Sequence, residues 1–186
     1  TTTINLAACL AERGQKVLVI DFDPQGNTTS GFGVDKDSAE HTSYDLLLEE
    51  NSIRHCISHT DFKVDLIPAN IDLSGAEVEL IGIEKREFLL RKQLDQVQDL
   101  YDFIWIDCPP SLNMLTVNAF CSADSVLVPI QCEFYALEGL SQLLNTINLV
   151  KRRLNPQIEI EGIVFTMYDN RPNLCNEVVQ EVRKYL

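Results

Sequence analysis

Long apolar runs are missing from this sequence, since no stretch approaches the ~20 residues that a membrane-spanning helix needs. Basic side chains are also scarce: 15 lysines and arginines stand against 28 aspartates and glutamates, a net charge of −13. This balance excludes a protein coated in basic surface for nucleic acid, although it allows a local basic patch. The densest basic clusters are Lys151–Arg152–Arg153 and Arg183–Lys184, with Arg171 between them.

Paired cysteine motifs are absent as well. The six cysteines are scattered without a CxxC pair, so we expect small buried hydrophobes rather than a disulfide framework, and a reducing, cytoplasmic compartment. His55, Cys56 and His59 have the spacing of metal ligands on one helix face. Because no second ligand pair lies nearby, an ordinary surface helix is the favoured interpretation of this segment.

The sequence shows no internal repeat, low-complexity tract or linker. Its 186 residues, 45% hydrophobic and 23% charged, are typical of one globular domain with an ample core. We therefore expect a single domain over residues 1–186. The first residue is Thr1 rather than Met, and we expect this domain to be truncated at both ends.

Two unbroken apolar runs, Val17–Ile20 and Phe103–Ile106, predict strands buried on both faces, as in a parallel sheet. Segments with helical spacing alternate with such runs, which predicts an α/β fold with a doubly wound, mainly parallel sheet flanked by helices. Further strands are expected at 64–68, 126–130 and 158–166. Helices are expected at 3–13, 44–49, 53–58, 76–81, 85–97, 112–121, 137–154 and 174–185, with a polar loop at 24–33.

Carboxylates follow both buried strands. Asp21 and Asp23 come after the first strand and Asp107 after the second, where ligands bind in open α/β sheets. Asp107 is the candidate holder of Mg²⁺, and Asp23 the candidate that positions a water for attack on phosphorus. Asp21 either orients the loop of Asp23 or contacts a metal-bound water. Pro109–Pro110 predicts an extended segment that moves as a unit, as switch loops do.

A run of threonines, Thr1–Thr2–Thr3, opens the first expected helix. Hydroxyls and free backbone N–H groups at a helix N-terminus form an anion site, although such a run also serves as a plain helix cap.

Together these segments resemble the ParA/Soj family of partitioning ATPases, within the wider group that includes MinD. The resemblance covers essentially the whole chain. Thr1–Ala8 is similar to the continuation of the family's deviant Walker A loop, KGGVGKT, and Asp21–Asn27 to its DxDPQGN signature. Ile106–Ser111 is similar to its Walker B and switch II segment. Further matches are Pro129–Gly139 and Thr166–Arg171.

The resemblance implies a P-loop NTPase-like fold that binds ATP with Mg²⁺, forms a homodimer on ATP binding and hydrolyses ATP slowly. It also implies nonspecific DNA binding, a ParB-like partner and a nucleoid-associated location. Carried over by position, Asp23 positions the attacking water, Asp107 holds Mg²⁺ through water, and Thr1 and Thr2 lie near the phosphates. Thr166 and Met167 lie near the adenine, and Arg171 contacts DNA.

The glycines, lysines and metal-ligating threonine of KGGVGKT, and the strand before them, are not in this sequence. We therefore expect the 186-residue polypeptide by itself to fold poorly and to lack ATP turnover, and its full-length parent to be the ATPase. Three alternatives stay open: a MinD-like membrane-associated ATPase, an iron–sulfur reductase using Cys108 and Cys132, and a regulator that binds nucleotide without turnover. The DPQGN and IQCEFYALEG strings favour the DNA-partitioning type.

Overall fold

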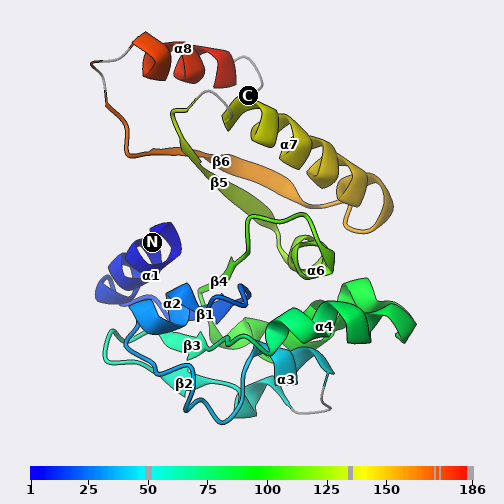
Figure 1. Ribbon diagram of the computed structural model, residues 1–186. Coiled ribbons are helices and arrows are strands. Elements are labelled where there is room, and N and C mark those ends of the chain that lie inside the picture. Colours follow the sequence, from blue (N-terminus) through cyan, green and yellow to red (C-terminus); the bar gives the residue numbers. More distant parts are fainter. Residues whose placement is uncertain (49–51, 134–135, 170, 172, 184–186) are drawn as a thin grey trace. The chain divides into compact units, whose positions relative to one another are not determined.

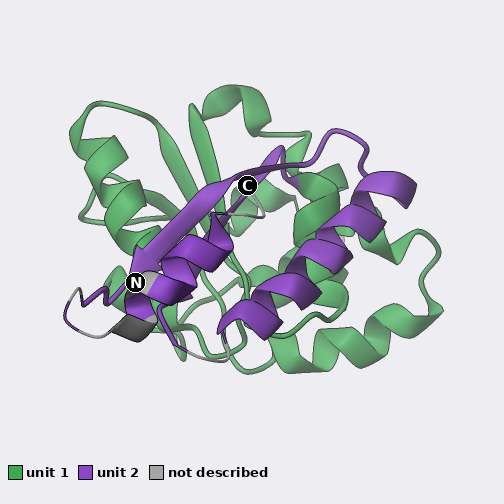
Figure 2. Ribbon diagram, turned by 90° about the horizontal axis from the view of Figure 1, so that it is seen from above, with its two compact units in different colours: residues 1–122 green, residues 123–186 purple. Residues whose placement is uncertain are grey.

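The computed structural model describes residues 1–48, 52–133, 136–169, 171 and 173–183. It divides the chain into two compact units, Thr1–Ser122 and Ala123–Leu186 (Figure 1, Figure 2). The expectation of one domain over the whole chain stays a prediction, and each unit is described separately below.

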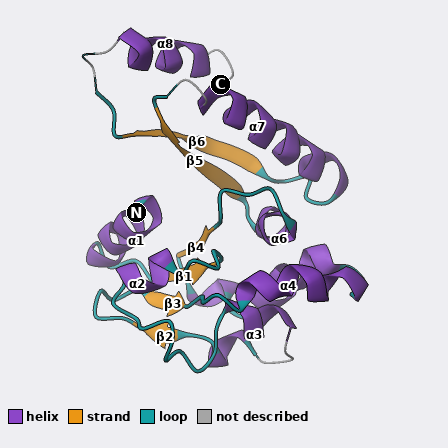
Figure 3. Cartoon of the chain, viewed as in Figure 1, coloured by secondary structure: helices purple, strands orange, loops and turns teal. Residues whose placement is uncertain are grey.

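The first unit is built on a four-stranded sheet in the order β2-β3-β1-β4 (Figure 3). Strand β1 pairs in parallel with β3 on one side and with β4 on the other, whereas β2 runs antiparallel to β3. The strands are β1 (Val17–Asp21), β2 (Ser58–His59), β3 (Asp65–Ile67) and β4 (Phe103–Asp107).

Helices cover both faces of this sheet. The α-helices of the unit are α1 (Thr2–Glu12), α2 (Asn27–Gly31), α3 (Ser43–Leu48), α4 (Leu73–Glu79), α5 (Leu89–Leu94) and α6 (Met114–Ser122). Short 3-10 helices span Ile53–His55, Leu80–Gly82, Arg86–Phe88 and Gln98–Leu100.

The side chains of β1 alternate between two hydrophobic cores. Leu18 and Ile20 pack with residues from α3, α4, α5 and α6, whereas Val17 and Val19 pack with Ala7 of α1 and its neighbours. This alternation follows from the two-residue period of a strand. It explains why the run Val17–Ile20 is apolar without interruption: both faces of β1 are covered, as the sequence predicted.

The second unit consists of a parallel pair of strands and two helices. Strand β5 (Ser125–Gln131) pairs with β6 (Glu159–Thr166), while α7 (Ala136–Arg153) and α8 (Asn173–Val182) pack on the pair. Val128, Ile130, Leu140 and Val178 form the core of this unit. In addition, the Cys175 thiol donates to the Cys132 carbonyl at 3.6 Å, which ties α8 to the end of β5.

Most predicted elements are confirmed with shifted ends, but three segments differ. The expected loop 24–33 contains the helix α2, and the expected helix 53–58 is a 3-10 turn that leads into β2. The expected helix 85–97 is split, since Arg86–Phe88 is a 3-10 turn and only Leu89–Leu94 is α-helical. Across the described ranges, no helix combines the length and the apolar character that crossing a bilayer requires.

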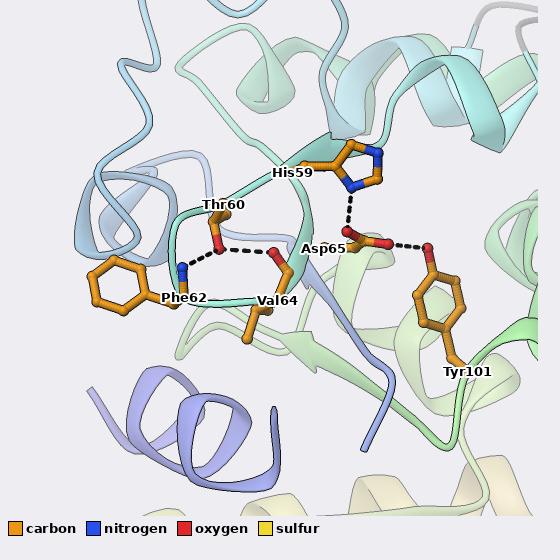
Figure 4. A network of polar contacts seen from close by, with 6 residues as sticks. All are labelled: His59, Thr60, Phe62, Val64, Asp65 and Tyr101. Carbon is orange, nitrogen blue, oxygen red and sulfur yellow. Dashed lines mark hydrogen bonds and ion pairs between the residues drawn. The ribbon is translucent and has the colours of Figure 1, made fainter. Parts of the chain in front are cut away.

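A polar network closes the β2–β3 hairpin (Figure 4). Asp65 lies between two partners: the Tyr101 hydroxyl donates to its Oδ2 at 2.7 Å, and His59 Nδ1 lies 2.5 Å from its Oδ1. Thr60 Oγ1 donates to the Val64 carbonyl at 2.8 Å within the turn. Burial, the hydrogen bond to Asp65 and the negative charge of that carboxylate together raise the pKa of Tyr101.

Candidate functional site

The carboxyl ends of β1 and β4 lie side by side, with Asp21 paired in register with Asp107. The backbone N–H of Phe22 donates to the Asp107 carbonyl at 2.8 Å, which extends the pairing by one residue. The two strand-end acids that the sequence singled out are therefore neighbours in space. Their meeting follows from parallel pairing, which brings equivalent strand ends to the same edge of a sheet.

The Asp107 carboxylate is held by two threonine hydroxyls. Thr3 Oγ1 donates to Oδ1 at 2.6 Å, and Thr28 Oγ1 donates to Oδ2 at 2.6 Å. Thr3 belongs to the first turn of α1, and Thr28 belongs to α2. Asp107 thus joins the N-terminal ends of two helices to the end of β4.

Asp21 is fully buried and accepts hydrogen bonds from the loop that follows it. Its Oδ2 accepts from the backbone N–H of Thr29 at 2.7 Å and from the Thr29 hydroxyl at 2.6 Å, while its Oδ1 accepts from the Asp23 N–H at 3.2 Å. Burial raises the pKa of this carboxyl, although the Thr29 and Asp23 hydrogen bonds oppose the shift. Thr29 Oγ1 also accepts from the Ala69 N–H at 2.9 Å, which connects the loop to the segment after β3.

Asp23 lies at the start of a tight turn and is only half-buried. Its Oδ1 accepts from the Gln25 N–H at 3.0 Å, and its carbonyl accepts from the Gly26 N–H at 2.9 Å. Gly26 has a left-handed backbone with φ of 61°, and a Cβ there would lie 2.7 Å from the Ala69 carbonyl oxygen. The turn therefore holds Asp23 half-buried, two positions after the buried Asp21.

The segment after Asp107 runs to the surface. Pro109 is half-buried and Pro110 is exposed, and α6 begins four residues later at Met114. The Asn113 side chain accepts the Thr116 N–H at 3.1 Å, which caps the first turn of α6. The two prolines thus connect the site carboxylate to a capped helix.

The remaining predicted site residues belong to the second unit. Thr166 closes β6 and its hydroxyl donates to the Ile130 carbonyl at 3.3 Å. Met167 follows with a left-handed backbone (φ 51°) and an exposed fraction of 84%. Gln131 Nε2 lies 3.5 Å from its sulfur, so both strand ends of this unit contribute to one exposed corner.

Arg171 forms an ion pair with Asp169. Its Nη2 lies 2.6 Å from Oδ2, and its Nε donates to Oδ1 at 2.9 Å. The pairing lowers the pKa of Asp169 and raises the pKa of Arg171. The other predicted basic residues, Lys151–Arg152–Arg153, form the last turn of α7, while Lys184 lies outside the described residues.

Two threonines of the site, Thr28 and Thr29, were not among the residues singled out from the sequence, whereas Thr3 was noted only as part of the run that opens α1. The available signal was the hydroxyl pair directly after the DPQGN turn, within reach of two strand-end acids. The described residues contain no group of three or more His, Cys, Asp and Glu side chains arranged for a metal ion. The surface helix expected over the segment 55–59 is wrong, because a 3-10 turn ends at His55, Cys56 is buried and β2 begins at Ser58.

Comparison with known proteins places this geometry in a family. A model of the AAA domain matches residues 1–160. The chain is 51% identical over 186 residues to the sporulation initiation inhibitor protein Soj of Bacillus subtilis, covering all of this chain and 74% of that protein. It is 52% identical over 186 residues to the chromosome partitioning protein ParA of Myxococcus xanthus, covering all of this chain and 66% of that protein.

A solved structure shares the fold closely. It is described as cobyrinic acid a,c-diamide synthase from Mycobacterium smegmatis with bound ATP analogue and magnesium, and it superposes with a TM-score of 0.93 at 38% identity. The match covers all of this chain and 76% of that one. Given the strand-end carboxylates, the threonine-rich helix start and these relatives, the chain belongs to the ParA/Soj family of ATP-dependent partitioning proteins.

Proposed function

We propose that this chain binds ATP at the ends of β1 and β4 and hydrolyses it slowly to drive the partition of DNA. The observation that carries the proposal is the Asp107 carboxylate, which accepts hydrogen bonds from the Thr3 hydroxyl in the first turn of α1 and from the Thr28 hydroxyl of α2. A phosphate group at this point would meet the free N–H groups and the positive end of the α1 dipole. Thr1 and Thr2, at the start of α1, are the residues proposed to contact it.

The residues around Asp107 fit Mg²⁺. Carboxylate and hydroxyl oxygens are the hard ligands that this ion prefers. Each Asp107 oxygen accepts one hydrogen bond from a hydroxyl and has a second lone pair that can accept another. This pattern supports contact through a water of the hydrated ion, with Asp107 and Thr3 as holders. When bound, Mg²⁺ supplies positive charge that offsets the charge of the phosphate oxygens.

Asp23 is the proposed water-positioning residue. It is half-buried two positions after the buried Asp21, and the turn closed at Gly26 fixes its backbone. A carboxylate in this position accepts a hydrogen bond from water and aims the water's lone pair at the γ-phosphorus. Asp21 acts through the loop instead, because it is fully buried and its oxygens accept from the Thr29 N–H, the Thr29 hydroxyl and the Asp23 N–H.

The segment with Pro109 and Pro110 is the proposed switch. It begins at the carboxylate that would respond to nucleotide and ends at the capped start of α6. A change at Asp107 would therefore be transmitted as a movement of the whole rigid segment. In the second unit, Thr166 and Met167 are the proposed adenine contacts, supported by their place at the end of β6, where Thr166 is half-buried and Met167 is exposed.

The proposed partners are a second copy of the chain on ATP binding, a ParB-like protein and nonspecific DNA, with Arg171 as the DNA contact. The support is the similarity to Soj and to the chromosome partitioning protein ParA over the whole of this chain.

The experiment is a pair of assays on the full-length protein. Asp23→Ala should keep binding of a fluorescent ATP analogue and lose turnover, whereas Asp37→Ala, at an exposed carboxylate of the following loop, should keep both. Turnover that survives in Asp23→Ala would assign water positioning to another residue. Nucleotide binding without turnover in the unmodified protein would instead support a non-hydrolysing regulator.

A further inference from the structure

Large apolar side chains are exposed on the helical segment that contains α4: Val78 lies in α4, Ile71 in the turn before it and Ile81 in the 3-10 helix after it. The exposed fractions are 65% for Ile71, 70% for Val78 and 68% for Ile81. A buried set faces the other way, into the core of the first unit: Leu73, Ala76 and Leu80. The helix is therefore apolar on two faces, although only one of them is covered.

The three exposed residues, called here the α4 stripe, share one side of the helix. The Ser74 N–H donates to the Ile71 carbonyl at 3.0 Å, so Ile71 and Ser74 are one three-residue turn apart, and Val78 follows Ser74 by four positions within α4. Ile81 follows Val78 by three positions in the 3-10 helix, and side chains at these spacings lie on one face. The exposed Ser74 lies between Ile71 and Val78 on this face. A small residue between large ones leaves room for a side chain of a partner to insert.

Carboxylates accompany the α4 stripe on both sides. Between Ile71 and Glu84 the sequence contains four acids, Asp72, Glu77, Glu79 and Glu84, and no lysine, arginine or histidine. Glu79 accepts the Tyr44 hydroxyl at 3.0 Å, and Glu77 accepts the Asn113 amide. The acidic run ends at Lys85 and Arg86, and Arg86 Nη1 donates to the Ile81 carbonyl at 3.1 Å.

We propose that the α4 stripe docks an amphipathic helix of a partner protein that has aliphatic side chains on one face and lysines or arginines along its edges. Aliphatic anchors at helical spacing would pack between Ile71, Val78 and Ile81, and the cations would meet the flanking carboxylates. The same carboxylates repel anionic lipid headgroups and nucleic-acid phosphates, which disfavours both as occupants. The proposal rests on exposure and charge alone and does not depend on the proposed ATPase activity.

The α4 stripe is connected to the segment that follows Asp107. Asn113 donates its side-chain amide to Glu77 and accepts the Thr116 N–H at 3.1 Å at the start of α6. A partner cation that binds Glu77 competes with Asn113 for the same carboxylate. Docking on α4 therefore acts on the cap of α6 without touching Asp107.

The test uses the full-length protein without nucleotide and three fluorescent synthetic peptides of about 18 residues, roughly five helical turns. One is an amphipathic helix of leucine and lysine, the second has the same composition in scrambled order, and the third has glutamate for lysine. Binding is measured by fluorescence anisotropy for the unmodified protein and for Val78→Ser/Ile81→Ser, Glu79→Gln and Leu149→Ser. Leu149 is a matched control, because it is an exposed apolar residue of α7 in the second unit.

The leucine–lysine helix should bind the unmodified protein, and Val78→Ser/Ile81→Ser should raise the dissociation constant of this complex about tenfold or more. Glu79→Gln should raise the dissociation constant by about threefold at low salt, and Leu149→Ser should leave it unchanged. Circular dichroism of each variant checks that the fold is kept.

Three results would overturn the proposal. The first is that the glutamate or the scrambled peptide binds the unmodified protein as tightly as the leucine–lysine helix does. The second is that the leucine–lysine helix does not bind the unmodified protein, or binds Val78→Ser/Ile81→Ser equally well. The third is self-association of the unmodified protein without peptide that Val78→Ser/Ile81→Ser abolishes, since the occupant would then be a second copy of the chain.

Discussion

Thr28 Oγ1 donates a 2.6 Å hydrogen bond to Asp107 Oδ2 across 79 positions of sequence. This contact joins α2, in a segment where the sequence predicted a loop, to the end of β4. Thr28 is itself buried, with an exposed fraction of 1%. The order of the loop after β1 therefore depends on a charged residue of another strand.

Replacing Thr28 with valine should destabilise the first unit, because valine keeps the shape of threonine and removes the donor. A hydrogen bond to a charged group contributes ~1.5–3 kcal/mol, so a loss of this size in the free energy of unfolding is expected for Thr28→Val. Thr28→Ser keeps the hydroxyl and should lose less. Denaturant unfolding of both variants measures the difference, and equal stabilities would show that the Asp107 bond contributes nothing.

Gly26→Ala should be more damaging than Gly33→Ala. Both glycines have positive φ, 61° and 76°, so both substitutions carry left-handed strain of ~1–2 kcal/mol. Only at Gly26 would the new Cβ lie 2.7 Å from a backbone oxygen, that of Ala69, whereas at Gly33 nothing lies within 4 Å. An additional ~1–3 kcal/mol of destabilisation is therefore expected for Gly26→Ala, measured by thermal or denaturant unfolding. Equal destabilisation by the two substitutions would mean that the turn can move away from the Ala69 carbonyl without a loss of stability.

Tyr101→Phe should flatten the loss of stability in alkaline solution. The folded-state pKa of Tyr101 is raised above its ordinary value of 10.0, so the folded state keeps the phenolic proton that the unfolded state releases. The stability contributed by this group is complete below pH 10 and is lost as pH rises toward the folded-state pKa. Unfolding curves at several alkaline pH values should show a steeper decline for the unmodified protein than for Tyr101→Phe. Parallel declines would argue against the Asp65 contact shown in Figure 4.

Cys9 should react with iodoacetamide much faster than Cys121 in the folded protein. Cys9 is exposed, whereas Cys121 is buried, and burial together with the charge of Glu87 raises the pKa of Cys121 to about 11. Because the thiolate is the reactive form, neutral solution leaves Cys121 almost entirely protonated. Peptide mass spectrometry after timed alkylation gives both rates. Similar rates before unfolding, and not only after it, would contradict the packing around α6.

Arg171→Glu in the full-length protein should abolish ATP-dependent retention of DNA while nucleotide binding stays intact. Asp169→Asn should have the opposite effect, because it removes the carboxylate that now pairs with Arg171. Retention in a gel-shift should fall steeply with salt in the unmodified protein, as phosphate contacts release counterions. Arg153→Glu is the control for a general effect of charge: equal loss in this variant would remove Arg171 from its proposed role.

Much of the fold could be predicted from the sequence because its signals are local. The apolar run Val17–Ile20 requires cover on both faces, and the structure confirms cores on both sides of β1. The sequence also predicted that the acids after β1 and β4 lie close together, since the carboxyl ends of parallel strands meet at one edge of a sheet. The family signature was equally local, and the similarity to Soj confirms it.

The tertiary structure decided how those carboxylates are used. Asp21 and Asp23 both follow the same strand in the sequence, yet Asp21 is buried and hydrogen-bonded to Thr29, whereas Asp23 is half-buried at a turn. Asp107 obtains its partners from Thr3 and Thr28, which are 104 and 79 positions away. Composition and periodicity predicted most of the strands and helices, because these signals are local, but not α2, which forms in an expected loop, nor the 3-10 turns at Ile53–His55 and Arg86–Phe88. The choice of a partner for each buried carboxylate depends on which donors the packed chain brings within hydrogen-bond distance, and only the tertiary structure determines that.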